Sequence, residues 1–335
     1  MILMSKRFLA AACAAATALA LSACSSAPSS EGNASKDGTL TVMASFYPLQ
    51  YLAEKIGGEH VTVTSLTPAG AEPHDLELSP KTVDALASAD AVVYLAGFQA
   101  AVDEAIEQQA PTTVIDVSPV VELVEANSSA NHPSEDEDAD EAQSGESTTE
   151  EHADHDHEGH HHDMSADPHF WLDPVRMASA ATLVGDKLAE ADPANADTYK
   201  ANAQALNEEL SALGDDLVAK TATCQIKTFV TAHTAFGYLA DRTGLTQVGI
   251  SGLDPDSSPS PARLAEISQI AKEQGVTTIF TEALIDPKVA QTLADDLGIS
   301  TAVLDPIESQ TDSSKDYAAV MKDNINALTT ANNCQ

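Results

Sequence analysis

Two series of short, β-branched apolar runs alternate with segments of helical periodicity, and this alternation constrains the fold more than any other feature. In the first series, strands are predicted at 39–46, 61–66, 91–96 and 112–117, and helices at 49–56, 81–87 and 100–108. In the second, strands are predicted at 227–232, 246–250, 276–281 and 301–304, and helices at 235–243, 261–273, 287–297 and 315–329. Buried strands that alternate with helices form parallel sheets flanked by helices. The sequence therefore predicts an α/β fold with two lobes.

A single long helix is predicted to join the lobes. Asp192-Pro193 is typical of a helix start, with Asp192 as the N-cap and Pro193 at the first helical position. Apolar residues then recur at spacings of four and three over 192–220, a helix roughly 40 Å long. They are Tyr199, Ala203, Leu206, Leu210, Leu213 and Leu217. The predicted domains are an N-terminal lobe at 39–191, this linking helix and a C-terminal lobe at 221–335.

The first 23 residues are predicted to be a lipoprotein signal peptide. Lys6 and Arg7 precede an apolar run at 8–21 that is too short to cross a bilayer as a helix. The run ends in Leu21-Ser22-Ala23-Cys24, which resembles a bacterial lipobox, where cleavage precedes a lipidated cysteine. Residues 24–38 would then be a flexible tether, and lipid on Cys24 would hold the protein on the outer side of the cell membrane. An ordinary signal peptide with an incidental cysteine is the alternative.

The predicted mature chain is strongly acidic. The formal charge of −36 becomes −38 once Lys6 and Arg7 leave with the signal peptide. Such a surface disfavours nucleic acid as a partner and attracts divalent cations. Of the 4 cysteines, Cys224 and Cys334 remain after cleavage and lipidation, and in an oxidising compartment we expect them to form a disulfide. A zinc site made from these two is disfavoured because neither lies in a C-x-x-C pair.

Residues 128–163 interrupt the first series with a segment of Glu, Asp, Ser and His that has almost no apolar residues. Such a composition predicts a disordered loop. Seven of the 11 histidines lie in it: His132, His152, His155, His157, His160, His161 and His162. Imidazoles flanked by carboxylates bind zinc weakly and reversibly, so the six from His152 onward are predicted to gather or sense zinc. A simple spacer is the alternative.

Three further histidines, His74, His169 and His233, lie at the ends of predicted strands or in short loops. Ligands of open parallel sheets bind beyond the carboxyl ends of the strands, so these imidazoles could converge there. Taken singly, each also fits a structural role: a turn for His74, packing beside the sole tryptophan for His169, and a core position for His233. His60, near the start of a strand, is predicted to be a surface residue.

Five stretches carry a more specific pattern: 45–49, 72–80, 167–174, 231–238 and 304–308. Together they resemble the zinc- and manganese-binding proteins of bacterial ABC importers, the ZnuA-like branch of the cluster A-I solute-binding proteins. The resemblance extends from about Thr39 to the C-terminus. It implies two lobes, each with a parallel sheet flanked by helices, joined by one long rigid helix. It also implies that His74, His169 and His233 are metal ligands.

In the family that the chain resembles, the fourth ligand varies between a carboxylate and water. Glu308 matches the glutamate of related zinc lipoproteins and follows a predicted strand; Asp305 is the alternative, and Glu282 a weaker one. Three imidazoles and a carboxylate suit tetrahedral zinc, whereas manganese prefers more oxygen ligands. Manganese-specific relatives tend to carry glutamate at the position of His233, so the resemblance favours zinc over manganese or iron.

The resemblance implies a monomeric, extracytoplasmic protein that captures zinc and delivers it to the permease of an ABC importer. No G-x-x-x-x-G-K-[ST] motif is present, so the importer's ATPase is expected to be a separate chain. A zinc hydrolase would need an open coordination position, and no predicted helix carries H-E-x-x-H. No residue pattern argues for an adhesin. We therefore predict a binding protein and not an enzyme.

Overall fold

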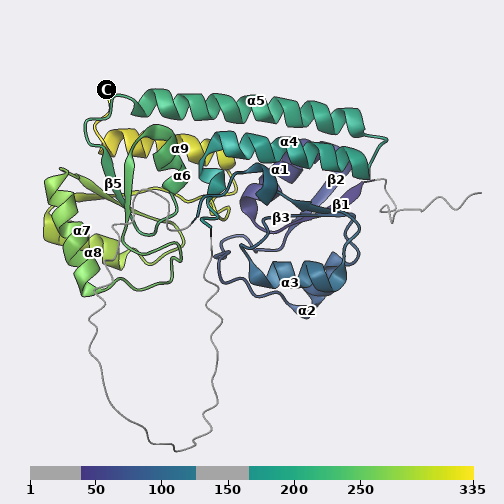
Figure 1. The fold of residues 1–335 in the computed structure, drawn as a ribbon, viewed down its shortest axis with the longest axis horizontal. Helices are drawn as coiled ribbons and strands as arrows, with labels where there is room; N and C mark the ends of the chain where they lie inside the picture. Colours follow the sequence, from purple (N-terminus) through teal and green to yellow (C-terminus); the bar gives the residue numbers. More distant parts are fainter. Residues whose placement is uncertain (1–38, 126–165) are drawn as a thin grey trace, which may run out of the picture. The chain divides into compact units, whose positions relative to one another are not determined.

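Two parallel four-stranded sheets form the framework of the computed structural model, which describes residues 39–125 and 166–335 (Figure 1). The predicted two-lobed α/β fold is confirmed. The predicted signal peptide, the tether with Cys24, and the acidic loop with its seven histidines lie outside the described residues.

The two sheets share one strand order. The first runs β2-β1-β3-β4 and the second β6-β5-β7-β8, with parallel pairing throughout. The strands are β1 (Leu40–Ala44), β2 (Val61–Ser65), β3 (Ala91–Tyr94), β4 (Val114–Asp116), β5 (Thr228–Thr231), β6 (Thr246–Gly249), β7 (Thr278–Thr281) and β8 (Ser300–Val303). In each sheet the two central strands are neighbours, β1 and β3 or β5 and β7. The connection after the first central strand leads to one edge of the sheet, and the connection after the second leads to the other edge. In open parallel sheets, ligands bind beyond the carboxyl ends of the strands beside such a reversal; here these are β1 and β3, and β5 and β7, and the region beyond them is called the crevice.

Helices cover both faces of each sheet. They are α1 (Tyr47–Gly57), α2 (Pro80–Leu86), α3 (Ala100–Gln109), α4 (Pro174–Ala191), α5 (Ala196–Thr221), α6 (Gly237–Thr243), α7 (Pro261–Glu273), α8 (Lys288–Leu297) and α9 (Tyr317–Ala331). Short 3₁₀ turns are η1 (Gly58–His60), η2 (Ser118–Val120) and η3 (Phe170–Leu172). Within the described ranges, no helix combines the length and apolarity needed to cross a bilayer.

The hydrophobic core divides along the faces of the sheets. Side chains alternate along a strand, so Met43 contributes to a cluster with α2 and α3, while its neighbours Val42 and Ala44 belong to the opposite face. A separate cluster lies between the second sheet and helices α7 and α8. The largest cluster includes buried residues of α1, α4, α5, α6 and α9, and therefore continues from one lobe into the other.

Helices α4 and α5 form a tightly packed hairpin that the sequence analysis describes only in part. Helix α4 was not predicted, and α5 begins at Ala196 with Asn195 as N-cap, so the predicted start at Asp192 is wrong. A Cβ on Gly185 would lie 2.3 Å from Cβ of Ala203, which shows how closely the two helices approach. The six apolar residues predicted for one face of α5 are all buried. Helix α5 packs against α1 and α4 and also against α6 and α9, so it spans both lobes (Figure 1).

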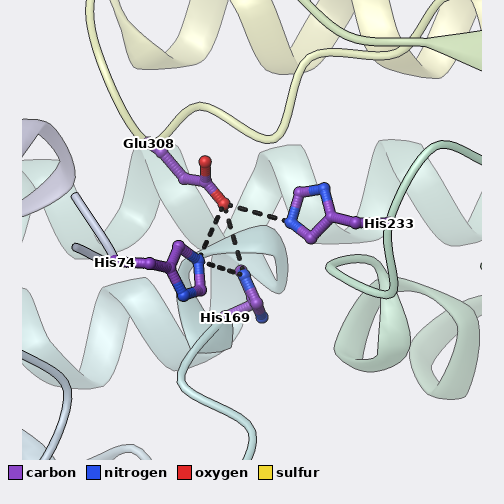
Figure 2. A group of neighbouring side chains, drawn as sticks. All are labelled: His74, His169, His233 and Glu308. Carbon is purple, nitrogen blue, oxygen red and sulfur yellow. Dashed lines mark hydrogen bonds and ion pairs between the residues drawn. The ribbon is translucent and has the colours of Figure 1, made fainter. Parts of the chain in front are cut away.

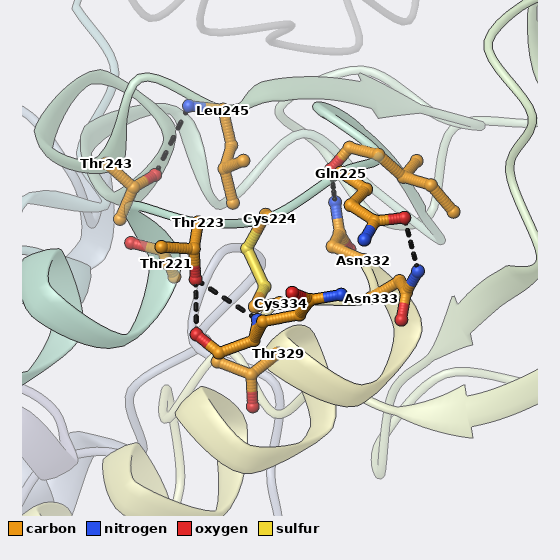
Figure 3. Close-up of a disulfide and its surroundings, with 12 residues drawn as sticks. Thr221, Thr223, Cys224, Gln225, Thr243, Leu245, Thr329, Asn332, Asn333 and Cys334 are labelled. Carbon is orange, nitrogen blue, oxygen red and sulfur yellow. Dashed lines mark hydrogen bonds between the residues drawn. A yellow bond between two sulfur atoms is a disulfide. The ribbon is translucent and has the colours of Figure 1, made fainter.

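A disulfide joins Cys224, which lies between α5 and β5, to Cys334 at the end of the chain (Figure 3). Hydrogen bonds surround it: the N–H of Ile226 donates to the carbonyl of Asn332 at 3.1 Å, and the N–H of Gln335 donates to Oγ1 of Thr223 at 3.1 Å. This covalent link lies at the amino end of β5, whereas the crevice lies at the carboxyl end of the same strand.

Candidate metal site

His233 lies two residues beyond β5, at the carboxyl end of the second sheet. Its side chain is fully buried, and Nδ1 lies 2.7 Å from Oε2 of Glu282, the residue that follows β7. The other carboxylate oxygen accepts a hydrogen bond from the backbone N–H of His233 at 3.1 Å. Because a carboxylate at Nδ1 holds one ring proton there, Nε2 is the nitrogen that faces the crevice, and it can bind a metal ion when it carries no proton.

His169 has the same kind of support. Oδ1 of Asp167 lies 2.8 Å from Nδ1 of His169 and accepts a hydrogen bond from its backbone N–H at 2.9 Å. Asp167 is fixed in turn, because its N–H donates to the carbonyl of Val124 and its own carbonyl accepts from the hydroxyl of Tyr238. The fully buried ring of His169 therefore also presents Nε2 to the crevice.

His74 lies in the loop between β2 and α2. Its backbone N–H donates to Oε2 of Glu72 at 2.8 Å, and its ring stands edge-on to Phe98 with the centroids 4.9 Å apart. The loop is anchored by Gln99, the N-cap residue of α3, whose side-chain amide donates to the carbonyl of Pro73 at 3.0 Å. These contacts fix the histidine on a segment that has no regular secondary structure.

Glu308 lies five residues beyond β8, on a segment held from several sides. The indole N–H of Trp171 donates to the carbonyl of Pro306, and Oγ of Ser309 accepts from the N–H of Gly70, both at 2.7 Å. Between them, Ile307 has a φ of 57°, the left-handed region that costs a β-branched residue about 1–3 kcal/mol. This turn places the Glu308 side chain inside the crevice, where it is 3% exposed.

Asp305 and Glu282, the alternative candidates for the fourth ligand, lie outside the group of donor atoms. Oδ1 of Asp305 accepts from the N–H of Ile307 at 2.8 Å, so this side chain shapes the turn before Glu308. Glu282 is bound to the far nitrogen of His233. Among the described residues, the group close enough to share one metal ion consists of His74, His169, His233 and Glu308.

Four donor atoms converge in this group (Figure 2). Oε1 of Glu308 lies 3.6 Å from Nε2 of His74, 3.3 Å from Nε2 of His169 and 3.4 Å from Nε2 of His233. The Nε2 atoms of His74 and His169 are 3.3 Å apart. A tetrahedron around an ion with N and O ligands at about 2.0–2.1 Å has edges of about 3.3–3.4 Å. These four separations are close to such edges, and all the donor atoms lie within 4.8 Å of one another, so the group can surround one ion.

The polar atoms of the group are poorly satisfied by the protein itself. Oε1 of Glu308 and Nε2 of His233 are buried and have no hydrogen-bond partner. A buried polar atom without a partner is costly and rare in native proteins. A divalent cation at the centre would satisfy both atoms.

The carboxylates and imidazoles around the centre shift one another's pKa values. Burial raises the pKa of Glu308, but the imidazoles of His169, His233 and His74, each within 3.6 Å of Oε1, outweigh burial and hold this pKa well below its usual range. Burial lowers the pKa of His233, yet the carboxylates of Glu282 and Glu308 raise it to about 10. For His169, carboxylates likewise outweigh burial and raise the pKa, whereas for His74 burial dominates and the pKa is lowered. Glu308 is thus an anion held among imidazoles.

We expect Glu282→Gln to weaken zinc binding by about 10- to 100-fold, because loss of a carboxylate behind a ligating histidine has effects of this size. The glutamine amide would donate to Nδ1 of His233 and move the ring proton to Nε2, where it would block the metal. Competition with a zinc indicator measures the change. Glu273→Gln on the exposed face of α7 is the matched control and should bind zinc normally. Equal affinities for the two variants would contradict the role of Glu282.

The sequence analysis missed the supporting roles of Asp167 and Glu282. From the sequence, Asp167 stands out only as part of a motif, and Glu282 only as a weaker candidate for the fourth ligand. Their positions carry the available signal, because Asp167 lies two residues before His169, and Glu282 directly follows β7, the strand that pairs with the one before His233. Deciding that they act behind the ligands requires the rotations of the imidazole rings, which sequence does not provide.

The two parallel sheets and the convergent donors between them define a two-lobed α/β protein with a candidate metal site built from three histidines and one glutamate. The chain belongs to the ZnuA family, described as the periplasmic component A of a zinc-uptake complex, whose model matches residues 42–331. The resemblance seen in the motifs is therefore confirmed.

Similar proteins agree with this assignment. The chain is 35% identical over 322 residues to the high-affinity zinc uptake system protein ZnuA of Bacillus subtilis, with 94% of each chain covered. It is 34% identical over 307 residues to the zinc-binding protein AdcA of Streptococcus pyogenes, covering 87% of this chain but only 56% of that relative. The solved structure of a zinc-bound variant of Streptococcus pneumoniae AdcAII has a TM-score of 0.73 and 29% identity, with 88% of this chain and 99% of that chain covered. The chain thus spans about half the length of the AdcA relative.

Proposed function

We propose that this protein captures zinc outside the cell and delivers it to the permease of an ABC importer. The observation that carries the proposal is the convergence of three imidazole Nε2 atoms and one carboxylate oxygen at tetrahedral separations in a buried site. A four-donor, nitrogen-rich set suits zinc, whereas manganese prefers more ligands and more oxygen. The names of the AdcA and ZnuA relatives, both given for zinc, support this choice.

Metal analysis of protein purified without added metal tests the proposal. We expect one zinc ion bound in the site, and we expect expression of the protein to restore growth on low zinc to cells that lack their own zinc-binding component. Zinc in trace amounts beside a full equivalent of manganese or iron would contradict the choice of zinc. Growth restored by added manganese instead of zinc would contradict it as well.

Binding, and not catalysis, is the function that we propose. Zinc hydrolases keep one coordination position open for water, whereas Glu308 lies where it would supply a fourth protein ligand, which supports binding. Turnover of model esters or peptides by the zinc-loaded protein would contradict this reading.

We further propose a monomer that is tethered to the membrane by lipid on Cys24 and works with a separate permease and ATPase. The lipobox-like sequence before Cys24 and the periplasmic description of the family support this location. Cell fractionation checks the anchor: Cys24→Ser should move the protein from the membrane fraction to the soluble fraction or the medium. Retention of the variant on the membrane would contradict lipidation at this residue.

Deletion of 128–163 should leave one tight zinc site and remove weaker ones, because the histidines of this segment are proposed to gather zinc for the site between the lobes. Titration calorimetry measures the number of sites. A variant in which the six histidines of 152–162 become serine, with the acidic residues kept, separates binding by imidazole from attraction by charge. A stoichiometry that is unchanged after deletion would contradict the proposed role.

A further inference from the structure

The four proposed ligands are almost closed off from solvent. The side chains of His169 and His233 are completely buried, and those of His74 and Glu308 are 5% and 3% exposed. A hydrated zinc ion must nevertheless reach them and leave again. The side chain of Glu72 lies on the His74 side of this group and is 24% exposed, so it extends from the buried donors toward the solvent.

The two carboxylate oxygens of Glu72 have different surroundings. Oε2 accepts the hydrogen bond from the backbone N–H of His74, which fixes the side chain. Oε1 is buried, has no hydrogen-bond partner and lies 3.9 Å from Nε2 of His74. Leaving a carboxylate oxygen buried without a donor is unfavourable, and a passing cation would satisfy it.

We propose that Glu72 is a transit ligand for zinc: the ion is held first by Oε1 of Glu72 and Nε2 of His74, and then moves to the complete four-donor site. Release follows the same steps in reverse. Zinc sites can expand to five ligands, so Glu72 can hold the ion while Glu308 joins or leaves. The inference rests on the proposed function, because it requires the zinc site.

A transit ligand has a kinetic signature that other roles lack. It stabilises an intermediate that both capture and release pass through, and it is absent from the final shell. Its loss therefore slows both rates by the same factor and leaves the dissociation constant unchanged. A charge that only steers the ion would change the association rate alone. A residue that only shapes the His74 loop would change the affinity.

Stopped-flow measurements on Glu72→Gln test the inference, with a fluorescent zinc indicator for capture and excess chelator for release. Glutamine keeps the size of the side chain and an oxygen that can accept from the N–H of His74. Glu77→Gln is the matched control, because it removes an exposed glutamate from the same segment. We expect both rates to fall about tenfold in Glu72→Gln, which corresponds to about 1.4 kcal/mol in each barrier. The dissociation constant should change less than about threefold, and the control should resemble the wild type.

Three results would overturn the inference: unchanged rates in Glu72→Gln, a slower association with normal release, or a weaker affinity caused by faster release. Equal slowing in Glu77→Gln would also overturn it, because the effect would then come from charge alone. If the unmodified protein binds no zinc, the proposed function fails and this inference fails with it. Normal zinc binding with unchanged rates in Glu72→Gln overturns the transit role only.

Discussion

His74→Ala should lower the affinity for zinc by more than about 100-fold, because it removes one of the four proposed ligands, and even the groups behind ligands contribute about 10- to 100-fold. The loss is also visible as stability. At a free zinc concentration about 1,000 times the dissociation constant, binding stabilises the folded protein by about 4 kcal/mol. A 100-fold weaker site retains about 1.4 kcal/mol of this stabilisation at the same concentration. Thermal unfolding of the wild type and of His74→Ala, each with and without zinc, measures this stabilisation.

His60→Ala is the matched control, since it removes an imidazole that packs against Tyr199 and lies outside the four-donor group. This variant should bind zinc with normal affinity and be stabilised by zinc like the wild type. Without zinc, the melting temperature of His74→Ala reports only the loss of the ring contacts with Phe98 and His169, so it separates this loss from the loss of zinc binding. Full stabilisation of His74→Ala by zinc would show that His74 is not a ligand.

Replacing both Cys224 and Cys334 with serine should lower the free energy of unfolding by about 2–5 kcal/mol, since the bond closes a long loop. The two cysteines are 110 residues apart in the sequence, which places the expected loss toward the upper end. In a protein of this size the melting temperature should fall by roughly 3–8 °C. Zinc affinity should hardly change, because the bond and His233 lie at opposite ends of β5.

Reduction of the wild-type protein provides the comparison for this prediction. Under dithiothreitol it should melt at the temperature of the double-serine variant, while the variant itself should not respond to the reductant. A melting temperature that is the same in both redox states would contradict a stabilising role of the bond.

The helices show where sequence reasoning succeeds and where it stops. Asp173-Pro174 and Asp192-Pro193 are the same dipeptide, yet only the first begins a helix: Asp173 caps α4 through the N–H of Val175. At Asp192, α4 has just ended, and the chain needs a short turn before α5 to form the helical hairpin. The side chain of Asp192 serves that turn by accepting from Asn195. Without α4 in the prediction, the need for a turn could not be seen.

The candidate site also has a part that the sequence predicts and a part that depends on the folded backbone. The three histidines are identified by their motifs and by the strands that precede two of them. The choice of Glu308 over Asp305 depends on backbone rotation at Ile307, which has a positive φ that its β-branched side chain would not suggest. Asp305 is turned toward the N–H of Ile307 by the same local geometry. Such torsion angles arise from the packed structure and not from residue type.

The order of the donors along the chain has a mechanical consequence. His74 and His169 precede α5, and His233 and Glu308 follow it, so each half of the chain supplies two donors. Chelation by four donors then exists only while the halves stay together, and slight separation leaves two bidentate fragments that hold an ion far less firmly. A membrane partner that draws the two halves apart could therefore release the bound ion without providing stronger ligands of its own.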